Sequence, residues 1–423
     1  MEITQDQVHD HSQTIVATCP ACGLLCDDVL IENKQSQPKV INTACAKSIQ
    51  FFEQPLLDTS PKIKGKNVTL DRAIEHTAKL LKVSNRPLYA GLSTDVQGFR
   101  AVYQLANKTN GNLQHVHAKS MARNVAVLQS SGWQTTTLTE VKNRADVIVC
   151  IGTDIVSHNT RFFERFVWLN TPQSNAMFTD AGKREVIYIG ENLNTKAGIS
   201  PDGRQPTSVN CSQSDLPNVL AVLRTLIAGK KLKAQTVAGI QLSELITIAE
   251  KLKQAKYAVL AWVAKDLDFQ HAELTIQSIT ESITLLNSQS SRAAGLSLGG
   301  SDGDTSANNA NTWLSGFSLN NNETDHDAIV WVNSFNAKNR PAKTDFPLIV
   351  LGNANTRFEQ TPDVFIPVAT PGLDCSGTLF RVDSAVILPL KKVRKSDLPT
   401  LKEVLRRIED QLTDSNSAES ISA

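Results

Sequence analysis

The chain has 423 residues, and its 43 basic and 42 acidic side chains leave a formal net charge of +1. This balance excludes a polyanion-binding protein with a large basic surface and a protein with an acidic tail. Hydrophobic residues make up 41% and charged residues 20% of the chain, which excludes an intrinsically disordered protein and is typical of globular ones. A chain of this length is expected to form about two to three domains.

The N-terminal segment does not resemble a targeting signal. Residues 1–20 contain no basic stretch followed by an apolar one, and no later apolar run is long enough to span a bilayer. We therefore expect a cytoplasmic protein without membrane partners, whose cysteines stay reduced.

Four of the seven cysteines lie near the N-terminus, with the spacing Cys19-x2-Cys22-x3-Cys26-x18-Cys45. Four thiolates are the ligand set of a [4Fe-4S] cluster or of a tetrahedral zinc ion. Three ligands on one tight loop and a fourth from a separate segment favour the cluster, because structural zinc more often uses two Cys-x2-Cys pairs. We expect a metal site at these four residues. The alternative is a set of buried, reduced thiols without a metal.

Helical and strand patterns alternate after the cysteines. Residues 69–81 place apolar side chains on one helical face, and residues 87–91 predict a buried strand that ends in a glycine turn. A helix is predicted over 99–105. Continuous apolar runs bounded by Gly or Pro predict further strands at 145–152, 185–190, 257–263, 328–332 and 346–352. Helical patterns occur at 216–227, 272–286 and 401–408.

This alternation predicts an α/β fold with two doubly wound, mostly parallel sheets. We expect a small cysteine-rich domain at 1–60, a first α/β region at 61–200, a second α/β region with a closing segment at 201–395, and a C-terminal helix with a flexible tail at 396–423. Residues 297–311 are rich in Gly, Ser, Asn and Asp. Their composition favours a surface linker, and a ligand-facing loop at a sheet edge is the alternative.

Histidines and basic residues outside the cysteine region show no catalytic signature. His115 and His117 alternate along a predicted strand, but without an acidic partner at metal-ligand spacing they favour a polar strand face. His158 follows a strand, where ligand-facing groups often lie, although a capped loop residue is more common. Arg161 lies in the first turn of a predicted helix, where we expect its side chain to be solvated. The basic run at 391–395 is too short to bind nucleic acid and favours a solvated turn or a subunit contact.

Several segments resemble one family in the order in which they occur along the chain. TCPACGLLCDDV at 18–29, together with Cys45, resembles the N-terminal iron-sulfur motif of molybdopterin-dependent oxidoreductases, most closely that of the formylmethanofuran dehydrogenase B subunit. GLST at 91–94 resembles the turn before that family's metal-ligating cysteine, and residues 145–166 resemble its ADV strand and the Arg-containing helix after it. The likeness covers nearly the whole chain and also includes TW-x2-G at 312–316, and G-x4-G-T with R-x-D within 363–393.

The chain departs from this family at the residue that binds molybdenum or tungsten. In the dehydrogenase, a cysteine or selenocysteine shortly after the G-x-S-T turn is the ligand, whereas this chain continues with DVQG at 95–98. No cysteine occurs between Cys45 and Cys150. A carboxylate is a harder ligand than a thiolate and would change both metal affinity and redox tuning. We therefore expect molybdopterin or tungstopterin to be absent, and we assign no catalytic residue.

The resemblance also extends to the B subunit of the formyltransferase/hydrolase complex of methylotrophic bacteria. In that complex a formyl group passes from formyltetrahydromethanopterin to a methanofuran-type carrier and is hydrolysed to formate, with hydrolysis on the amidohydrolase-like A subunit and transfer on the formyltransferase D subunit. The resemblance implies a structural or carrier-docking component in one-carbon metabolism that assembles with the A, C and D subunits. It also implies an alternative, a catalytic B subunit of formylmethanofuran dehydrogenase with tungsto- or molybdopterin and a [4Fe-4S] cluster.

Overall fold

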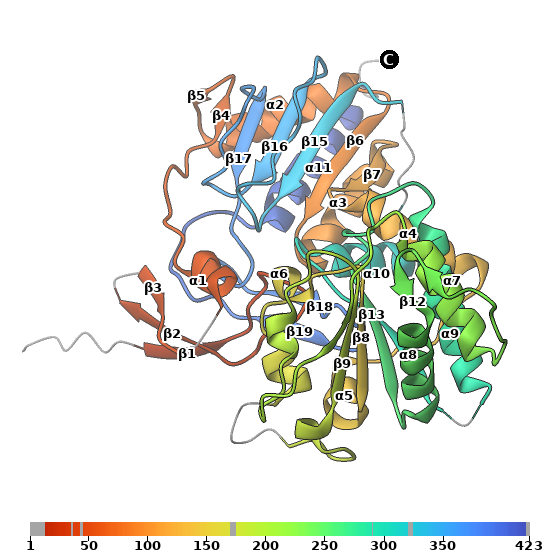
Figure 1. Ribbon diagram of the computed structural model, residues 1–423. Helices are drawn as coiled ribbons and strands as arrows, with labels where there is room; N and C mark the ends of the chain where they lie inside the picture. The colour runs from red at the N-terminus through yellow and green to blue at the C-terminus, as the bar shows by residue number, and fades with distance from the viewer. Residues whose placement is uncertain are drawn as a thin grey trace, which may run out of the picture.

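The structure is a computed structural model that describes residues 13–419, except 35–36, 43–44, 170–174, 290 and 320–324. Its two large sheets have seven and five strands, and a three-stranded antiparallel sheet precedes them in the sequence. Figure 1 shows the seven-stranded sheet at the top, the five-stranded sheet below it and the small sheet to one side. The prediction of a mixed α/β chain with parallel sheets is confirmed.

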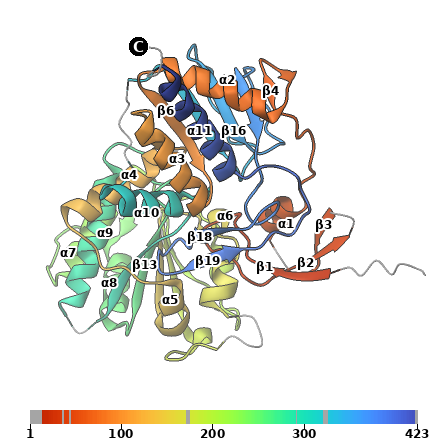
Figure 2. The same ribbon diagram turned by 180° about the vertical axis from the view of Figure 1, so that it is seen from behind.

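The seven-stranded sheet combines strands from two distant parts of the chain in the order β5-β4-β17-β16-β15-β6-β7. The neighbours from β17 to β7 run parallel, whereas β4 pairs antiparallel with both β17 and β5. Helices α2 (Leu70–Val83), α3 (Val96–Lys108) and α11 (Leu401–Glu419) cover one face of this sheet (Figure 2). The strands are β4 (Lys62–Ile63), β5 (Lys66–Asn67), β6 (Pro87–Ser93), β7 (Asn112–His115), β15 (Ala328–Asn333), β16 (Leu348–Gly352) and β17 (Val364–Pro367).

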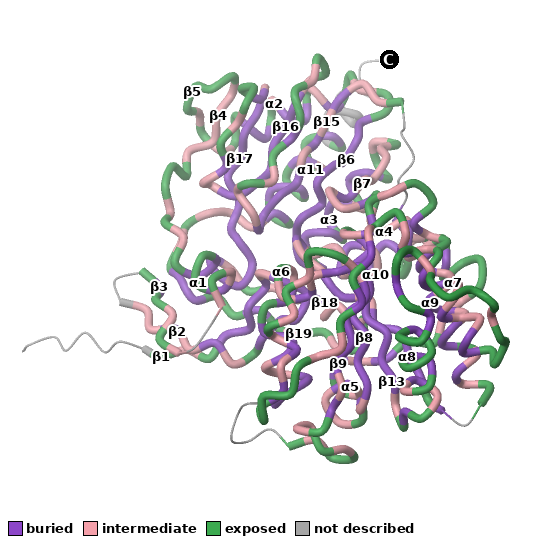
Figure 3. Tube along the Cα trace, in the orientation of Figure 1, coloured by how far each residue is buried: buried purple, intermediate pink, exposed green. Residues whose placement is uncertain are grey.

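The five-stranded sheet is parallel throughout, with the order β10-β9-β8-β13-β14. Val147, Val149 and Ile151 of β8 face a core shared with α7, α8 and α9, while Ile148 and Cys150 face the opposite core, which contains the cysteine loop. This alternation buries both faces, as a parallel sheet requires (Figure 3). The elements are α4 (Ala118–Ser130), α5 (Leu138–Arg144), β8 (Val147–Ile151), α6 (Ile155–His158), β9 (Glu185–Ile189), β10 (Thr207–Val209), α7 (Leu216–Ile227), β11 (Thr236–Val237), β12 (Ile240–Gln241), α8 (Leu242–Gln254), β13 (Ala258–Trp262), α9 (Ala272–Asn287) and β14 (Ala293–Ser297).

The remaining strands and α-helices lie outside the two large sheets. The small sheet consists of β1 (Gln13–Ala17), β2 (Val29–Lys34) and β3 (Gln37–Val40), and α1 (Ala46–Phe52) follows it. Helix α10 (Asp304–Ser315) and the hairpin of β18 (Gly377–Phe380) and β19 (Ile387–Leu390) complete the fold. None of the described helices has the length and apolar character needed to cross a membrane.

Two boundaries differ from those expected. The boundary between residues 200 and 201 falls inside the five-stranded sheet, between β9 and β10. Helix α11 continues to Glu419, well beyond the helical pattern predicted over 401–408, while 420–423 lie outside the described residues. Leu405, Ile408 and Leu412 extend the apolar face of α11 against the core of the seven-stranded sheet, which favours the longer helix.

Candidate functional site

Three of the four clustered cysteines lie on the loop between β1 and β2. The Cys19 N–H donates a hydrogen bond to the Cys26 carbonyl over 2.8 Å, and the Leu25 N–H donates one to the Cys22 carbonyl over 3.2 Å. Leu25 has a left-handed backbone conformation with φ 46°, which lets the chain double back within this short loop. All three thiols are buried as a result.

Cys45 brings the fourth thiol from the N-cap position of α1, where its side chain makes no capping hydrogen bond. Burial, with smaller contributions from the thiols of Cys22 and Cys45, raises the pKa of Cys19 to about 12. Burial also raises the pKa of Cys26, and the thiols of Cys22 and Cys19 add to this increase. The structure thus gathers the four predicted residues in one place. The raised pKa values keep the thiols of Cys19 and Cys26 protonated at neutral pH unless a metal displaces the protons.

The groups around the thiols suit a metal centre with thiolate ligands. Ser48 Oγ is buried beside the Cys19 thiol and has no hydrogen-bond partner apart from this sulfur in the described part of the chain. Its hydroxyl would find an acceptor in a negatively charged thiolate. Arg165 and Arg161 lie near Cys26 and oppose the increase that burial causes in its pKa. Donors and positive charge of this kind stabilise metal-bound sulfur.

The spacing of these thiols bears on the type of metal. Among the described residues, no three His, Cys, Asp or Glu side chains are placed to hold a metal ion. A tetrahedral zinc ion with Zn–S bonds of about 2.3 Å would bring its sulfurs to about 3.8 Å from one another. A four-iron cluster is a larger body than a single zinc ion, and four thiolates hold it as well.

Gly23 allows the cysteine loop to lie directly against the chain after β14. Its N–H donates a hydrogen bond of 2.6 Å to the Gly300 carbonyl, and its carbonyl accepts one of 2.9 Å from Val382 N–H. A Cβ atom at Gly23 would come within 2.7 Å of both the Gly299 carbonyl oxygen and Val382 Cβ. Only glycine permits this approach.

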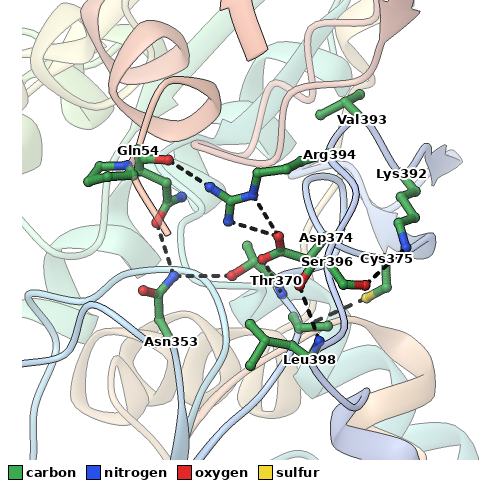
Figure 4. Close-up of polar contacts among 12 residues, drawn as sticks. Gln54, Asn353, Thr370, Asp374, Cys375, Lys392, Val393, Arg394, Ser396 and Leu398 are labelled. Atoms are coloured by element: carbon green, nitrogen blue, oxygen red, sulfur yellow. Dashed lines mark hydrogen bonds and ion pairs between the residues drawn. The ribbon is translucent and has the colours of Figure 1, made fainter. Parts of the chain in front are cut away.

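A buried ion pair ties α1 to the ends of the seven-stranded sheet (Figure 4). Arg394 Nε donates to Asp374 Oδ1 over 2.8 Å, and Arg394 Nη1 donates to the Gln54 carbonyl just beyond α1, also over 2.8 Å. Asn353 Nδ2 donates to both Gln54 Oε1 and Thr370 Oγ1. The expected solvated turn at 391–395 is therefore wrong for Arg394, which is 5% exposed because its charge is paired in the interior.

A cleft of about 1110 Å³ lies beside the cysteine loop, at the carboxyl ends of strands from both sheets. Its walls include residues 263–265 after β13, residues 335–339 after β15, and the start of α4. Ligand sites of α/β proteins lie at such strand ends. Residues 298–302 also line the cleft, and α10 follows them, so the surface-linker interpretation of 297–311 is wrong. The alternative, a loop that faces the cleft from a sheet edge, describes the observed arrangement.

The turn after β6 does not fit a molybdenum or tungsten ligand. Asp95 is the N-cap of α3, and its Oδ1 accepts the Gly98 N–H over 3.0 Å. Asp95 Oδ2 accepts the Thr378 N–H over 3.2 Å, so both carboxylate oxygens are occupied by backbone donors. Gln97 is exposed and does not line the cleft. Of the described residues that line the cleft, none is a cysteine.

His115 and His117 form a buried cluster with Asp302, so the expected polar strand face is wrong. His115 Nδ1 accepts the His117 N–H over 3.0 Å, and His115 Nε2 lies 3.2 Å from the Asp302 carbonyl. His117 Nε2 lies 2.8 Å from Asp302 Oδ2 and 2.9 Å from Ser301 Oγ. Burial raises the pKa of Asp302, but the hydrogen bond from His117 and its charge outweigh this and lower it. The acidic partner was missed because it lies 185 residues away from His117.

A second histidine and a neighbouring arginine also have acidic partners. His158 lines the cleft, and its Nε2 lies 2.7 Å from Asp266 Oδ1, while Thr153 Oγ1 donates to Asp266 Oδ2 over 2.5 Å. Arg161 is 6% exposed and holds both carboxylate oxygens of Asp28, at 2.8 and 2.9 Å. The expectation of a solvated Arg161 is therefore wrong, since this bidentate pair draws the guanidinium inward.

The buried His115 makes a testable contribution to stability. Burial lowers its pKa from 6.5 to about 4, so between these values the unfolded chain binds one more proton than the folded chain. Above pH 6.5 the neutral His115 costs no stability. As the pH falls from 6.5 to 4, the free energy of unfolding should decrease by about 3 kcal/mol because of this group. Chemical denaturation across this range should show a shallower pH dependence in His115→Gln. His271→Asn at the surface should retain the wild-type slope, and equal slopes in His115→Gln and wild type would refute the assignment.

Curated relatives match the chain over most of its length. It is 24% identical to the B subunit of the tungsten-containing formylmethanofuran dehydrogenase 2 of Methanococcus maripaludis, over 93% of this chain and 98% of the relative. The same subunit of Methanocaldococcus jannaschii is 23% identical, with the same coverage. The B subunit of the formyltransferase/hydrolase complex of Methylorubrum extorquens is 38% identical over 90 residues, which are 21% of this chain and 25% of the relative. No family model matches the sequence.

Solved structures share the fold. A chain of the formyltransferase/hydrolase complex FhcABCD from Methylorubrum extorquens, solved with methylofuran, superposes with a TM-score of 0.69 and 23% identity, over 85% of this chain and 100% of that one. Acetylene hydratase from Pelobacter acetylenicus superposes with a TM-score of 0.61 and 10% identity, over 94% of this chain and 69% of that one. The chain is therefore homologous to the B subunit of formylmethanofuran dehydrogenase, and it has the fold of a chain of the formyltransferase/hydrolase complex.

Proposed function

We propose that this chain is one component of a formyltransferase/hydrolase complex in the one-carbon metabolism of methylotrophs, with a structural or carrier-docking role and no redox centre of its own. Formyl transfer and hydrolysis then take place on partners of the formyltransferase D and amidohydrolase-like A types, with a C-type partner completing the assembly. The methanofuran-type carrier reaches this chain only through the complex. The local identity of 38% to the B subunit of that complex and the shared fold support this proposal.

The observation that carries the proposal is the turn after β6. The homologous dehydrogenases are described as tungsten-containing, and in this chain the turn contains Asp95, a cap whose two oxygens bind backbone N–H groups. Releasing Asp95 toward a metal would leave the Gly98 and Thr378 donors unpaired in a buried place, which is costly. A resident tungsto- or molybdopterin centre is therefore disfavoured.

We propose further that Cys19, Cys22, Cys26 and Cys45 hold a [4Fe-4S] cluster with a structural role, and zinc is the alternative. The gathering of four thiols, the buried Ser48 hydroxyl and the arginines near Cys26 support a metal centre. The ligation energy would add to the folding of the segment from β1 to α1, which also places Leu24, Ile31 and Phe52 in the core.

An exposed apolar surface on α10 supports assembly with other chains. Trp313 is 62% and Leu314 is 40% exposed, and Phe317 just beyond the helix is 75% exposed. Exposed apolar side chains that lie together are typical of subunit contacts.

The second candidate function is a working B subunit of formylmethanofuran dehydrogenase. Retention of all four N-terminal cysteines favours it, because a cluster is most useful where electrons move. Full-length similarity to the tungsten enzymes favours it too. Co-purification of the chain with its natural partners decides between the two functions. Formate release without dye-linked oxidation supports our proposal, whereas dye-linked oxidation of the formylated carrier supports the dehydrogenase.

Gln97→Ala tests whether the former ligand region takes part in chemistry. Gln97 is exposed in the first turn of α3 and outside the cleft, so formate release by the assembled complex should stay within about twofold of wild type. A loss of a hundredfold, which corresponds to about 2.7 kcal/mol of transition-state stabilisation, would show that this region acts in the reaction.

A further inference from the structure

One wall of the cleft contains His117, and its hydrogen bond to a carboxylate fixes the tautomer of the neutral ring. The Asp302 side chain is 7% exposed and its pKa is lowered despite burial, so it is a carboxylate and can only accept. The proton of a neutral His117 therefore sits on Nε2, 2.8 Å from Asp302 Oδ2. This leaves the lone pair of His117 on Nδ1.

The second ring nitrogen of His117 is not used by the fold. His117 is the N-cap of α4, yet its side chain makes no capping hydrogen bond. Nδ1 has no hydrogen-bond partner among the described residues, and the 11% exposed side chain lines the cleft. In its neutral form His117 thus offers a ring nitrogen that the fold does not use, on a residue that lines a space large enough for a small molecule.

His115 supports His117 and Asp302 through hydrogen bonds to the backbone of each. A backbone N–H can only donate, so the His115 nitrogen that accepts from His117 is unprotonated and the other nitrogen donates to the Asp302 carbonyl. Burial lowers the pKa of His115 to about 4, which keeps it neutral near pH 7. His115 therefore fixes the backbone of both partners without adding a charge.

We propose that the cleft is also a non-redox hydrolytic site, separate from the formyl chemistry of the partner chains, in which His117, oriented by Asp302, acts through Nδ1 as the general base for water that attacks the acyl group of a bound ester or amide. When water attacks, Nδ1 takes its proton, the new carbon–oxygen bond forms as the bond to the leaving group breaks, and Nδ1–H returns the proton to the leaving group. The site is not a Ser-His-Asp triad, because Ser301 and Asp302 share the same ring nitrogen of His117.

Diethyl pyrocarbonate is a suitable acyl probe, since the imidazole lone pair displaces ethyl carbonate from it and forms an N–C bond. Timed modification of the full chain, followed by peptide mass spectrometry, should show that His117 reacts at least as fast as the exposed His271 while His115 stays unmodified. This outcome is expected despite the low exposure of His117, because the residue lines the cleft and its Nδ1 has no hydrogen-bond partner among the described residues. Modification of His271 without His117 would overturn the proposal.

Asp302→Asn provides a sharper test, because Asp302 has φ 56°, a left-handed conformation that asparagine also tolerates. The amide can donate to Nε2 and move the proton to Nδ1, so carbethoxylation of His117 should slow by about tenfold or more. Ser301→Ala leaves Asp302 in place and should change the rate by less than about threefold. Unchanged rates at His271 and continued protection of His115 show an intact fold. If Asp302→Asn then reacts at the wild-type rate, the proposed role of Asp302 is wrong.

Discussion

Cys45→Ser is expected to destabilise the protein by about 4 kcal/mol if the metal is held at a thousandfold above its dissociation constant. The sign of the effect is informative, because Cys45 is the N-cap of α1 and makes no capping hydrogen bond. Serine is a favourable N-cap residue and without a metal should stabilise α1 by up to about 1 kcal/mol. A metal centre and a set of metal-free thiols thus predict opposite changes in stability.

Chemical denaturation under anaerobic conditions measures this change, and Cys375→Ser is the matched control. Cys375 is similarly half-buried but lies outside the N-terminal cluster, so its replacement should leave the metal content unchanged. Iron, sulfide and zinc should all fall in Cys45→Ser if one of the two proposed centres is present. A Cys45→Ser protein as stable as wild type or more stable would mean that the thiols hold no structural metal.

Arg394→Met is expected to lower the free energy of unfolding by about 3–5 kcal/mol, because it leaves the Asp374 carboxylate, 1% exposed, without its partner in the interior. The variant also loses the hydrogen bond to the Gln54 carbonyl at the end of α1. Thermal and chemical denaturation measure the loss. Residues of α1, which include Cys45 at its start, should be the first to lose protection in hydrogen exchange.

Two variants separate the buried pair from a general effect of charge. Arg406 and Asp410 form an ion pair at the surface, where the side chains are 79% and 60% exposed, so Arg406→Ala should cost less than about 0.5 kcal/mol. The double variant Arg394→Met with Asp374→Leu should recover part of the loss, since no unpaired charge remains. Equal losses of unfolding free energy in Arg394→Met and Arg406→Ala would show that the buried ion pair of Arg394 stabilises the protein no more than a surface pair does.

Local patterns were sufficient to predict most elements of the two sheets. The helix predicted over 216–227 is α7, and the apolar runs correspond to β6, β8, β9, β13, β15 and β16 to within a few residues. Strands β6, β8 and β16 are buried on both faces, so they appear in the sequence as continuous apolar runs. The assignment of strands to sheets could not be predicted in this way. Strand β15 pairs with β6, and β16 and β17 extend the sheet from β15, although all strands of the five-stranded sheet lie between β7 and β15 in the sequence.

The candidate site was predictable only where its residues are close in sequence. The spacing of Cys19, Cys22 and Cys26 already indicates a shared site, because three residues on a short loop cannot lie far apart. The pairs His117–Asp302 and Arg394–Asp374 depend on long-range packing, and a lone histidine or a basic run has no local pattern that identifies its partner. Composition was misleading at 297–311, where small polar residues form the wall of a cleft.

Elemental analysis of the natural complex, purified without oxygen, tests the central claim that this chain has lost the pterin metal and kept the cysteine-bound centre. Our account predicts about four iron and four sulfide per chain at Cys19, Cys22, Cys26 and Cys45, with molybdenum and tungsten below one-tenth equivalent. One equivalent of tungsten or molybdenum per chain would contradict the account and establish the dehydrogenase alternative.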